Sequence, residues 1–260
     1  MRARSVDLAR RKGDYGFDAP YVPLLLGGGA LLLLLAGVVN IRLGSPLWAA
    51  VTLAGGALLL LSTASYVYTT RVGKFMVWSR LLRDLRLRGD ERVLDLGCGR
   101  GAVLLMAAQL VPRGGVVGVD LWKAADQSGN RMEVTLLNAE FEGVRERVDL
   151  RTGDMRSLPF PDGSFDVVLS SLAIHNLPDA GARREAVDEA VRVLKPGGRL
   201  LIADIRSGDE YVRRLRQLGL REAERRDLGW RFWYGGPWMA TSLVAASKPA
   251  VTRPVPRLPV

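Results

Sequence analysis

Two long apolar runs near the amino end constrain this 260-residue chain more than any other feature. Residues 21–41 and 47–68 contain no charged side chain, and Arg42 is the one charge from residue 20 to residue 70. At about 1.5 Å per helical residue, the shorter run reaches roughly 31 Å, which is about the thickness of the hydrocarbon core of a bilayer. The sequence therefore predicts a two-helix transmembrane anchor over residues 21–70.

The flanks of this anchor predict its orientation. Ser45 and Pro46 suit the N-cap and the first position of a second helix, so the two spans form a hairpin. Basic residues lie outside the hairpin on both sides: Arg2, Arg4, Arg10, Arg11 and Lys12 before it, and Arg71, Lys74, Arg80 and Arg83 after it. By the positive-inside rule we expect a two-span protein of the cell membrane with residues 1–20 and the rest of the chain in the cytoplasm. The alternative is a buried helical hairpin, for which little chain remains as a cover.

The next segment, residues 71–89, predicts a basic amphipathic juxtamembrane helix. Phe75, Trp78 and Leu82 fall near helical spacing, and lysine and arginine side chains alternate with them. This arrangement places basic charge, including that of Lys74, beside the membrane. The helix either lies against anionic lipid, packs on the following domain, or does both.

Charge and composition restrict the partners. The formal net charge is +10, with one cysteine and one histidine. A disulfide framework, a multi-cysteine zinc site and a histidine-rich metal cluster are therefore excluded, and we predict no metal site. The positive charge suits nucleic acid, anionic lipid or an acidic cofactor, but the membrane flanks account for much of it, so we expect a lipid bilayer as partner and no nucleic acid.

Residues 90–249 alternate short β-branched runs with helical ones. Strands are predicted at 91–96, 116–120, 148–152, 165–170, 199–203, 222–227 and 241–247, and helices at 102–111, 131–142, 180–193 and 210–218. Such alternation predicts right-handed crossovers and an α/β fold with a doubly wound, mostly parallel seven-stranded sheet. Residues 195–198 are expected to form a turn, and residues 250–260 a flexible tail.

A glycine-rich turn follows the first predicted strand. Gly97, Gly99 and Gly101 have the spacing G-x-G-x-G, whereas a dinucleotide fingerprint has G-x-G-x-x-G. Asp95, two residues before the turn, would repel a phosphate and favour an ammonium. The turn therefore predicts a nucleoside ligand with a positively charged tail, to which Cys98 offers only its backbone.

At these residues the sequence resembles the class I S-adenosylmethionine-dependent methyltransferases, especially the branch that acts on small molecules and quinone-like substrates. The resemblance covers residues 90–249, and implies a Rossmann-like fold and the cofactor S-adenosylmethionine. It implies that residues 95–101 hold the methionine part of the cofactor and that Asp120 accepts hydrogen bonds from the ribose hydroxyls. The other cofactor residues implied are Leu121 and Trp122 against the ribose and adenine, Asp154 at the adenine amine, Met155 on its ring, and Ser170.

The function expected is a membrane-anchored methyltransferase that acts on a small lipophilic acceptor by in-line displacement. His175 is the catalytic candidate, because its ordinary pKa is near neutrality and it follows the fourth strand. It either contacts substrate or acts as a base, or it only shapes the pocket. Ser171, Asn176 and Asp204 are further pocket candidates.

Three segments each keep more than one interpretation. Residues 123–130 line the cofactor mouth or form a plain loop, and residues 14–18 fold over the pocket or form a linker. The aromatic-rich segment 229–238 roofs an apolar pocket or touches the bilayer, unless it is an aromatic minicore. Alternative functions are methylation of RNA or protein, or non-catalytic cofactor binding at the membrane. No pattern in the sequence indicates a particular oligomeric state.

Overall fold

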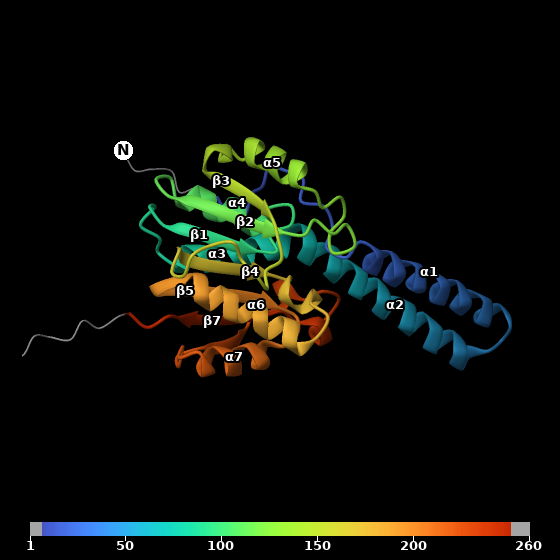
Figure 1. Cartoon of the computed structure of the whole chain (residues 1–260). Helices are drawn as coiled ribbons and strands as arrows, with labels where there is room; N and C mark the ends of the chain where they lie inside the picture. Colours follow the sequence, from blue (N-terminus) through green and yellow to red (C-terminus); the bar gives the residue numbers. More distant parts are fainter. Residues whose placement is uncertain (1–6, 251–260) are drawn as a thin grey trace, which may run out of the picture.

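A seven-stranded sheet forms the centre of the computed structural model, which describes residues 7–250 (Figure 1). The strands are β1 (Arg92–Leu96), β2 (Gly115–Asp120), β3 (Val148–Thr152), β4 (Phe165–Ser171), β5 (Leu194–Asp204), β6 (Glu224–Asp227) and β7 (Ser242–Ser247). Their order is β3-β2-β1-β4-β5-β7-β6; the first five are parallel, and β7 runs antiparallel to both β5 and β6. The predicted seven-stranded, mostly parallel Rossmann-like sheet is confirmed. Most of the predicted tail, residues 251–260, and residues 1–6 lie outside the described residues.

The fifth strand begins five residues earlier than predicted. β5 begins at Leu194, so the expected turn at 195–198 belongs to the strand. The register between β4 and β5 shifts there, and the Gly197 amide donates to the Lys248 carbonyl at 2.8 Å. Because Pro196 has no amide hydrogen, this part of the strand pairs irregularly.

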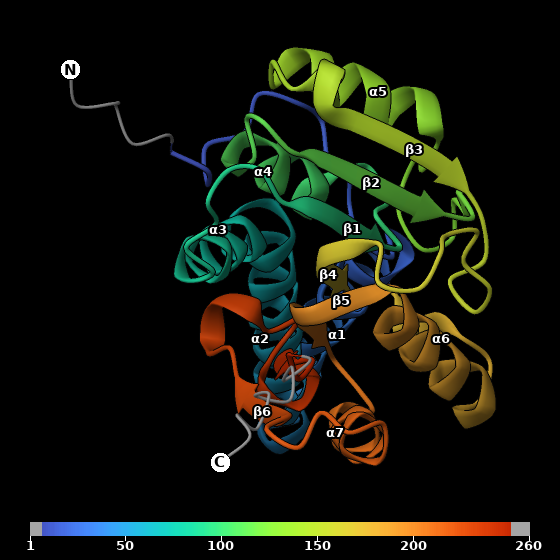
Figure 2. The same ribbon diagram turned by 60° about the vertical axis from the view of Figure 1, so that its left-hand side comes forward.

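Helices cover both faces of the sheet (Figure 2). One face carries α3 (Lys74–Asp84), α4 (Ala102–Leu110) and α5 (Met132–Phe141), and the other carries α6 (Ala180–Val193) and α7 (Gly208–Gln217). Because β1 is covered on both faces, residues 93–96 are all buried, as is typical of a central parallel strand. Two hydrophobic clusters, one on each face, hold the helices in place and fix the turns that follow the strands.

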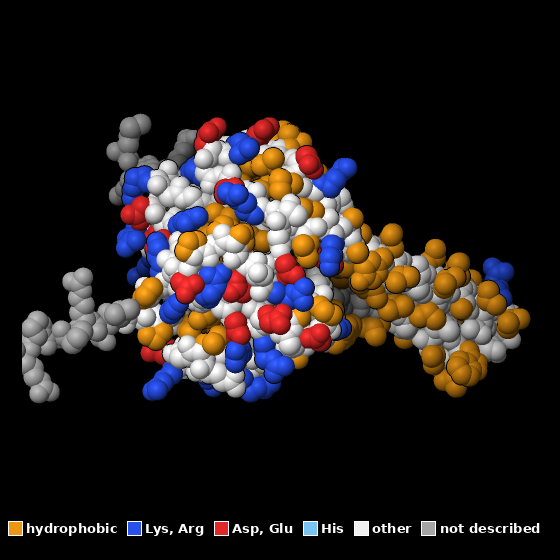
Figure 3. Space-filling view, viewed as in Figure 1, with side chains coloured by type: hydrophobic (Ala, Val, Ile, Leu, Met, Phe, Trp, Pro, Cys, Tyr) orange, Lys and Arg blue, Asp and Glu red, His pale blue; other side chains and the backbone are white. Residues whose placement is uncertain are grey.

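Two apolar helices, α1 (Tyr21–Arg42) and α2 (Pro46–Tyr68), project from the domain as a hairpin (Figure 1). Their surface is almost entirely hydrophobic up to a basic group at the far end (Figure 3). A Cβ on Gly37 would lie 2.5 Å from Leu53, and one on Gly56 would lie 2.8 Å from Leu34, so glycine permits close helix packing at both positions. Both helices are long and apolar enough to cross a membrane.

The second hairpin helix continues into the α/β domain. A π-helical turn, Thr69–Gly73, joins α2 to α3, so residues 46–84 form one continuous helical rod. The predicted basic helix at 71–89 is thus the shorter α3, whose apolar face packs on the sheet through Phe75 and Trp78. Lys74 is not part of an exposed basic face, contrary to the prediction: it is buried and paired with Asp18.

Candidate active site

The turns that follow β1, β2, β3 and β4 surround a cavity of about 1030 Å³, open mouth included. Asp95, Asp120 and Asp154 all line this cavity: Asp95 lies in β1, Asp120 ends β2 and Asp154 follows β3. In a parallel sheet the carboxyl ends of the strands meet at one edge, which explains why carboxylates so far apart in the sequence come together. The cavity therefore has a strongly acidic wall.

Asp95 is the most deeply buried of these acids, with 1% of its surface exposed. Within the described part of the chain, its Oδ1 atom has no hydrogen-bond partner. Burial, together with the negative charge of Asp120, raises the pKa of Asp95 to about 8. An unpaired buried carboxylate at a cavity is stabilised by a cationic ligand, so this wall suits a positively charged group.

Asp120 and Asp154 have different surroundings. The Asp120 carboxylate accepts from the Gly99 amide at 2.8 Å, from the Trp122 amide at 2.6 Å and from the Asn130 side chain at 3.1 Å. It therefore ties the glycine turn to the loop after β2. Asp154 instead pairs with Arg156 at 2.6 Å, and the hydrogen bonds from that guanidinium lower the pKa of Asp154.

The glycine turn is shaped by its protein neighbours. Gly97 has φ +70°, and a Cβ there would lie 2.2 Å from the Cβ of Ala173. A Cβ on Gly99, φ +49°, would lie 2.6 Å from the side-chain oxygen of Gln127. Glycine is thus required here because two other loops approach the turn closely, and not only because a ligand does.

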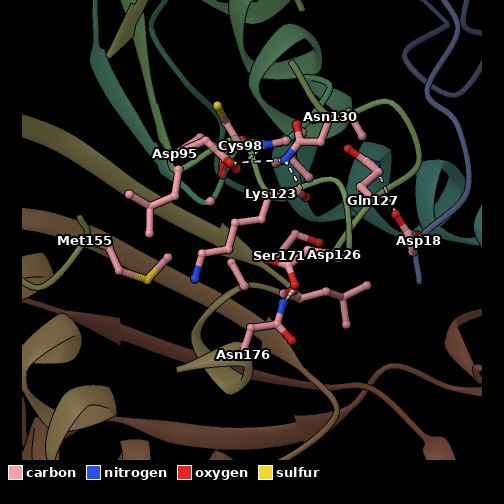
Figure 4. Close-up of a pocket in the computed structure, with 18 of the residues that line it drawn as sticks. Asp18, Asp95, Cys98, Lys123, Asp126, Gln127, Asn130, Met155, Ser171 and Asn176 are labelled. Carbon is pink, nitrogen blue, oxygen red and sulfur yellow. Dashed lines mark hydrogen bonds between the residues drawn. The ribbon is translucent and has the colours of Figure 1, made fainter. Parts of the chain in front are cut away.

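Eight of the predicted cofactor residues line the cavity: Asp95, Gly97, Cys98, Gly99, Asp120, Leu121, Asp154 and Met155, of which Asp95, Cys98 and Met155 are labelled in Figure 4. Gly101, Trp122 and Ser170 do not line it. Gly101 is the N-cap of α4, and the Trp122 indole donates to Thr152. The Ser170 hydroxyl is fully buried and donates to the Leu96 carbonyl at 3.0 Å, which joins β4 to β1.

Cys98 offers the cavity no reactive thiolate. Burial and the charges of Asp120 and Asp95 raise the pKa of the Cys98 thiol well above its ordinary value. The thiol therefore stays protonated at neutral pH, which makes it a poor nucleophile.

His175 lies just outside the cavity lining, on the short 3₁₀ turn Ile174–Asn176 that follows β4. Its Nδ1 atom lies 2.5 Å from Asp204 Oδ1, and its amide donates to Asp204 Oδ2 at 3.0 Å. The same turn brings Ala173 and Asn176 into the cavity wall. The pairing with Asp204 thus anchors a turn whose neighbours line the cavity.

We predict that His175→Ala lowers methyl-transfer turnover and leaves cofactor affinity little changed, since within residues 7–250 no hydrogen bond or ion pair joins Asp95, Asp120 or Asp154 to this turn. Turnover and calorimetric affinity measured on the same preparation check this. His175→Asn keeps a side-chain donor for Asp204, so recovery of activity in H175N assigns a positioning role, and continued loss assigns proton transfer. Normal turnover in H175A would contradict both roles.

Four residues from before the sheet also line the cavity, namely Asp18, Lys74, Phe75 and Trp78. Asp18 belongs to residues 14–18, for which one interpretation was a fold over the pocket, whereas no site role was expected for Lys74, Phe75 or Trp78. Asp18 belongs to the segment 12–19, here called the strap, which runs along the loop 126–130. The strap is tied down at Phe17, whose amide donates to Ser128 Oγ at 2.8 Å, and at Ala19, whose amide donates to the Asp126 carbonyl at 3.0 Å. A lysine within the apolar face of α3 is the one sequence signal that could have indicated this wall.

The strap and the loop 126–130 resolve two of the open interpretations, because both segments reach the cavity. Gln127 of the loop joins the strap to the glycine turn. Its amide nitrogen donates to Asp18 Oδ1 at 3.0 Å, and its oxygen accepts from the Arg100 amide at 2.8 Å. Figure 4 shows Gln127 and Asp18 meeting at the cavity rim.

The aromatic segment 229–238 packs on the base of the hairpin. The Trp233 carbonyl accepts from Thr69 Oγ1 at 2.7 Å and from Ser65 Oγ at 3.1 Å. The Trp230 ring stacks on Tyr68 with a centroid distance of 5.4 Å, and more than half of its surface is exposed. This segment does not line the cavity; it joins the hairpin to the domain.

Comparison with known proteins identifies the domain that holds the cavity. Residues 94–202 match the protein family described as Methyltransferase domain. This part of the chain is a methyltransferase domain. Its cofactor is S-adenosylmethionine, a cation whose charge suits the acidic wall described above.

Relatives in sequence include an uncharacterised methyltransferase, YcgJ, of Bacillus subtilis (strain 168), which is 36% identical over 143 residues, or 53% of this chain and 52% of that protein. A demethylmenaquinone methyltransferase of Lactiplantibacillus plantarum is 33% identical over 130 residues, covering 50% of this chain and 51% of the relative. The 27-O-demethylrifamycin SV methyltransferase of Amycolatopsis mediterranei is 37% identical over 48% of this chain and 42% of its own. The chain thus spans about half the length of the curated relatives it matches.

Solved structures share the fold. The geranyl diphosphate C-methyltransferase of Streptomyces coelicolor A3(2) superposes with a TM-score of 0.52 over 67% of this chain and 77% of its own, at 19% identity. The [4+2]-cyclase SpnF gives a TM-score of 0.53 over 66% of this chain and 82% of its own, at 23% identity. Because one of these is named a cyclase, the shared fold does not by itself define the reaction.

Proposed function

We propose that this protein is a membrane-anchored enzyme that transfers a methyl group from S-adenosylmethionine to a small lipophilic acceptor at the cytoplasmic face of the cell membrane. One observation carries the proposal: the helical rod of residues 46–84 runs from an exposed apolar hairpin into the wall of the acidic cavity. One continuous helix thus connects the proposed anchor to the wall of the cofactor cavity.

The cofactor assignment rests on the charge and position of the three cavity acids. Asp95 would face the cationic methionine part, Asp120 would accept from the ribose hydroxyls, and Asp154 with Met155 would hold the adenine. The unpaired Oδ1 of Asp95 supports this fit, because it has an acceptor to offer a cation. When bound, S-adenosylmethionine supplies a methyl group already activated on a sulfonium sulfur. The protein then has to orient the acceptor and exclude water, and the buried Phe75 and Trp78 side chains do both on one wall.

The anchor rests on the surface of the hairpin. Its leucine and valine side chains are largely exposed, and a soluble protein rarely exposes an apolar surface of this extent. The base of the hairpin carries the Tyr68–Trp230 stack, and Arg231 lies over the Trp230 ring at 4.6 Å. Aromatic and basic side chains of this kind concentrate where a membrane meets water. We therefore place the cavity at the cytoplasmic interface, within reach of molecules dissolved in the bilayer.

The acceptor class follows from this placement. Demethylmenaquinone and rifamycin intermediates appear in the names of the relatives, and both kinds of molecule are small. A quinone-like, isoprenoid or polyketide acceptor agrees with a cavity that opens beside a lipid-embedded hairpin.

Transfer of a labelled methyl group into a whole-membrane lipid extract tests the proposal. We expect label in one lipid-soluble product, identified by mass spectrometry, with the full chain reconstituted in vesicles. An Asp120→Ala variant serves as the inactive control. Label in RNA or peptide substrates instead, or no label despite cofactor binding, would overturn the proposal in favour of the alternative functions.

A further inference from the structure

Lys74 is a buried lysine in the wall of the cavity, with 5% of its side chain exposed. Its Nζ atom donates to both carboxylate oxygens of Asp18, at 3.0 and 2.8 Å. No other acceptor for Nζ is found among residues 7–250. An ammonium has three N–H donors, so one donor remains for a ligand in the cavity.

Asp18 is already saturated. Its Oδ1 atom accepts from Lys74 and from Gln127 at 3.0 Å, and its Oδ2 atom accepts from Lys74 and from the Tyr234 hydroxyl at 2.7 Å. Burial raises the pKa of Tyr234 well above its ordinary value, so Tyr234 donates as a neutral phenol. With its four lone-pair positions occupied, Asp18 has little capacity to accept a proton from a substrate. Its role is to hold the Lys74 ammonium in place.

The charge of Lys74 is opposite to that of the rest of the wall. Asp95, Asp120 and Asp154 suit a cation, whereas an ammonium suits an oxygen that carries lone pairs or negative charge. Lys123 also lines the cavity, but from the loop after β2, where its carbonyl accepts from the Asn130 side chain. Lys74 is flanked instead by Phe75 and Trp78, and the Trp78 indole is fixed by a 2.9 Å hydrogen bond to Ser171. Flat aromatic walls beside a cation suit a ring that bears a hydroxyl group.

We propose that Lys74 binds the hydroxyl oxygen of a phenolic or enolic methyl acceptor and stabilises its anion, with Asp18 as the positioning residue. The acceptor O–H bond breaks on binding, the proton goes to water, and the electron pair stays on the oxygen. Lys74 keeps its three protons throughout. The resulting anion is nucleophilic at oxygen and at the ring carbons beside it, so no separate base is needed. This inference rests on the proposed function and specifies its acceptor class.

A chromophoric phenol tests the inference without methyl transfer. The full chain in phosphatidylcholine nanodiscs is mixed with 2-decyl-4-nitrophenol, and its ionisation is followed by absorbance as the pH is varied. In the wild type we expect the midpoint to fall by roughly one to three pH units relative to protein-free nanodiscs, because a nearby cation favours the anion. Lys74→Met should return the midpoint to the protein-free value. Lys195→Met, which removes the same charge at a residue that does not line the cavity, should leave it as in the wild type.

Removing the charge of Asp18 and removing the charge of Lys74 are expected to have opposite effects on the ionisation midpoint of the phenol. Asp18→Asn keeps an oxygen that can accept from the Lys74 ammonium and hold it in place, but removes the competing negative charge, so the midpoint should fall at least as far as in the wild type. A merely structural ion pair would make D18N and K74M behave alike. Because K74M leaves a carboxylate unpaired and can destabilise the fold, the double variant D18N/K74M removes both charges and should also give the protein-free midpoint.

Three results would overturn the inference: a wild-type midpoint equal to that of protein-free nanodiscs, an unshifted midpoint in D18N/K74M relative to the wild type, or equal shifts in D18N and K74M. The titration needs no cofactor. It therefore remains informative if the lipid-extract experiment finds no transfer, and the two failures are distinguishable.

Discussion

Asp95→Asn lowers the affinity for S-adenosylmethionine on the order of 100-fold, which is the largest effect we expect from a single change in the cofactor wall. The carboxylate is buried, one of its oxygens lacks a partner, and the proposed ligand group is a cation. Removing one member of such a desolvated charge pair costs about 2 to 5 kcal/mol, and about 2.7 kcal/mol corresponds to 100-fold. Isothermal calorimetry on the full chain in detergent measures the affinity directly.

The same residue gives the binding a pH dependence whose sign follows from its raised pKa. In the free protein Asp95 titrates near pH 8, so it is mostly protonated at pH 6. A cation binds the ionised form, so binding displaces the proton. We therefore expect the affinity to rise about tenfold per pH unit between roughly pH 6 and 7.5, with one proton released, and to be flat in D95N.

Folding stability should change in the opposite sense. The pKa of Asp95 is raised from 3.8 to about 8, so between these values the native state holds a proton that the unfolded state gives up. Stability of the cofactor-free protein therefore falls as the pH rises through this window. D95N removes that loss and should melt at a higher temperature than the wild type at pH 8, although it binds cofactor poorly.

Asp166→Asn is the matched control for these measurements. Asp166 lies near the start of β4, pairs with Lys195 at 2.8 Å and does not line the cavity. The same change of carboxylate to amide there should leave cofactor affinity and its pH dependence unchanged. Equal affinity in D95N and D166N, or a flat pH profile in the wild type, would rule out the role proposed for Asp95.

The sequence could predict the cofactor acids because the sheet topology brings them together. Asp95 and Asp120 lie at or near the carboxyl ends of predicted parallel strands, and these ends meet at one edge of the sheet whatever the conformation of the loops. The glycine spacing and the alternation of strands and helices can both be recognised in short stretches of the sequence, and together they indicate this topology. The position of Asp154 was implied by the family resemblance, and the structure places this residue in the cavity wall.

The other wall depends on packing that no local pattern specifies. Asp18 and Lys74 are 56 residues apart, and they meet because the hairpin returns the chain to the strap. The amino-acid sequence of a three-residue turn also does not determine which of its side chains points into the cavity. His175 points to Asp204, while Asn176, one residue later, lines the cavity. Positions of this kind become visible only when the segments are packed together.

The hairpin itself is joined to the domain at a point where a single side chain would not fit. A Cβ on Gly73 would lie 1.9 Å from the Arg231 carbonyl oxygen, a backbone atom that cannot rotate away. Gly73→Val should therefore displace the segment 229–239 from the hairpin base, breaking the Tyr68–Trp230 stack. Tyr234, which belongs to that segment, would then lose its hydrogen bond to Asp18.

We expect G73V to lower methyl transfer to lipid-soluble acceptors on the order of 100-fold, because a misplacement of about 1 Å beside a reacting group can cost that much. Cofactor affinity should change little, since the turns after β1, β2 and β3 do not contact Gly73. Transfer rate, calorimetric affinity and protease sensitivity of residues 229–239 are the three measurements.

Gly28→Val is the matched control, because a Cβ at Gly28 in α1 has no atom within 4 Å. It adds the same apolar bulk to the hairpin without touching the joint. If G73V and G28V transfer methyl groups equally well, the joint between hairpin and domain has no part in catalysis, and the hairpin acts only as the proposed anchor. If only G73V fails while its cofactor affinity is kept, the position of the hairpin helps to set the acceptor side of the cavity.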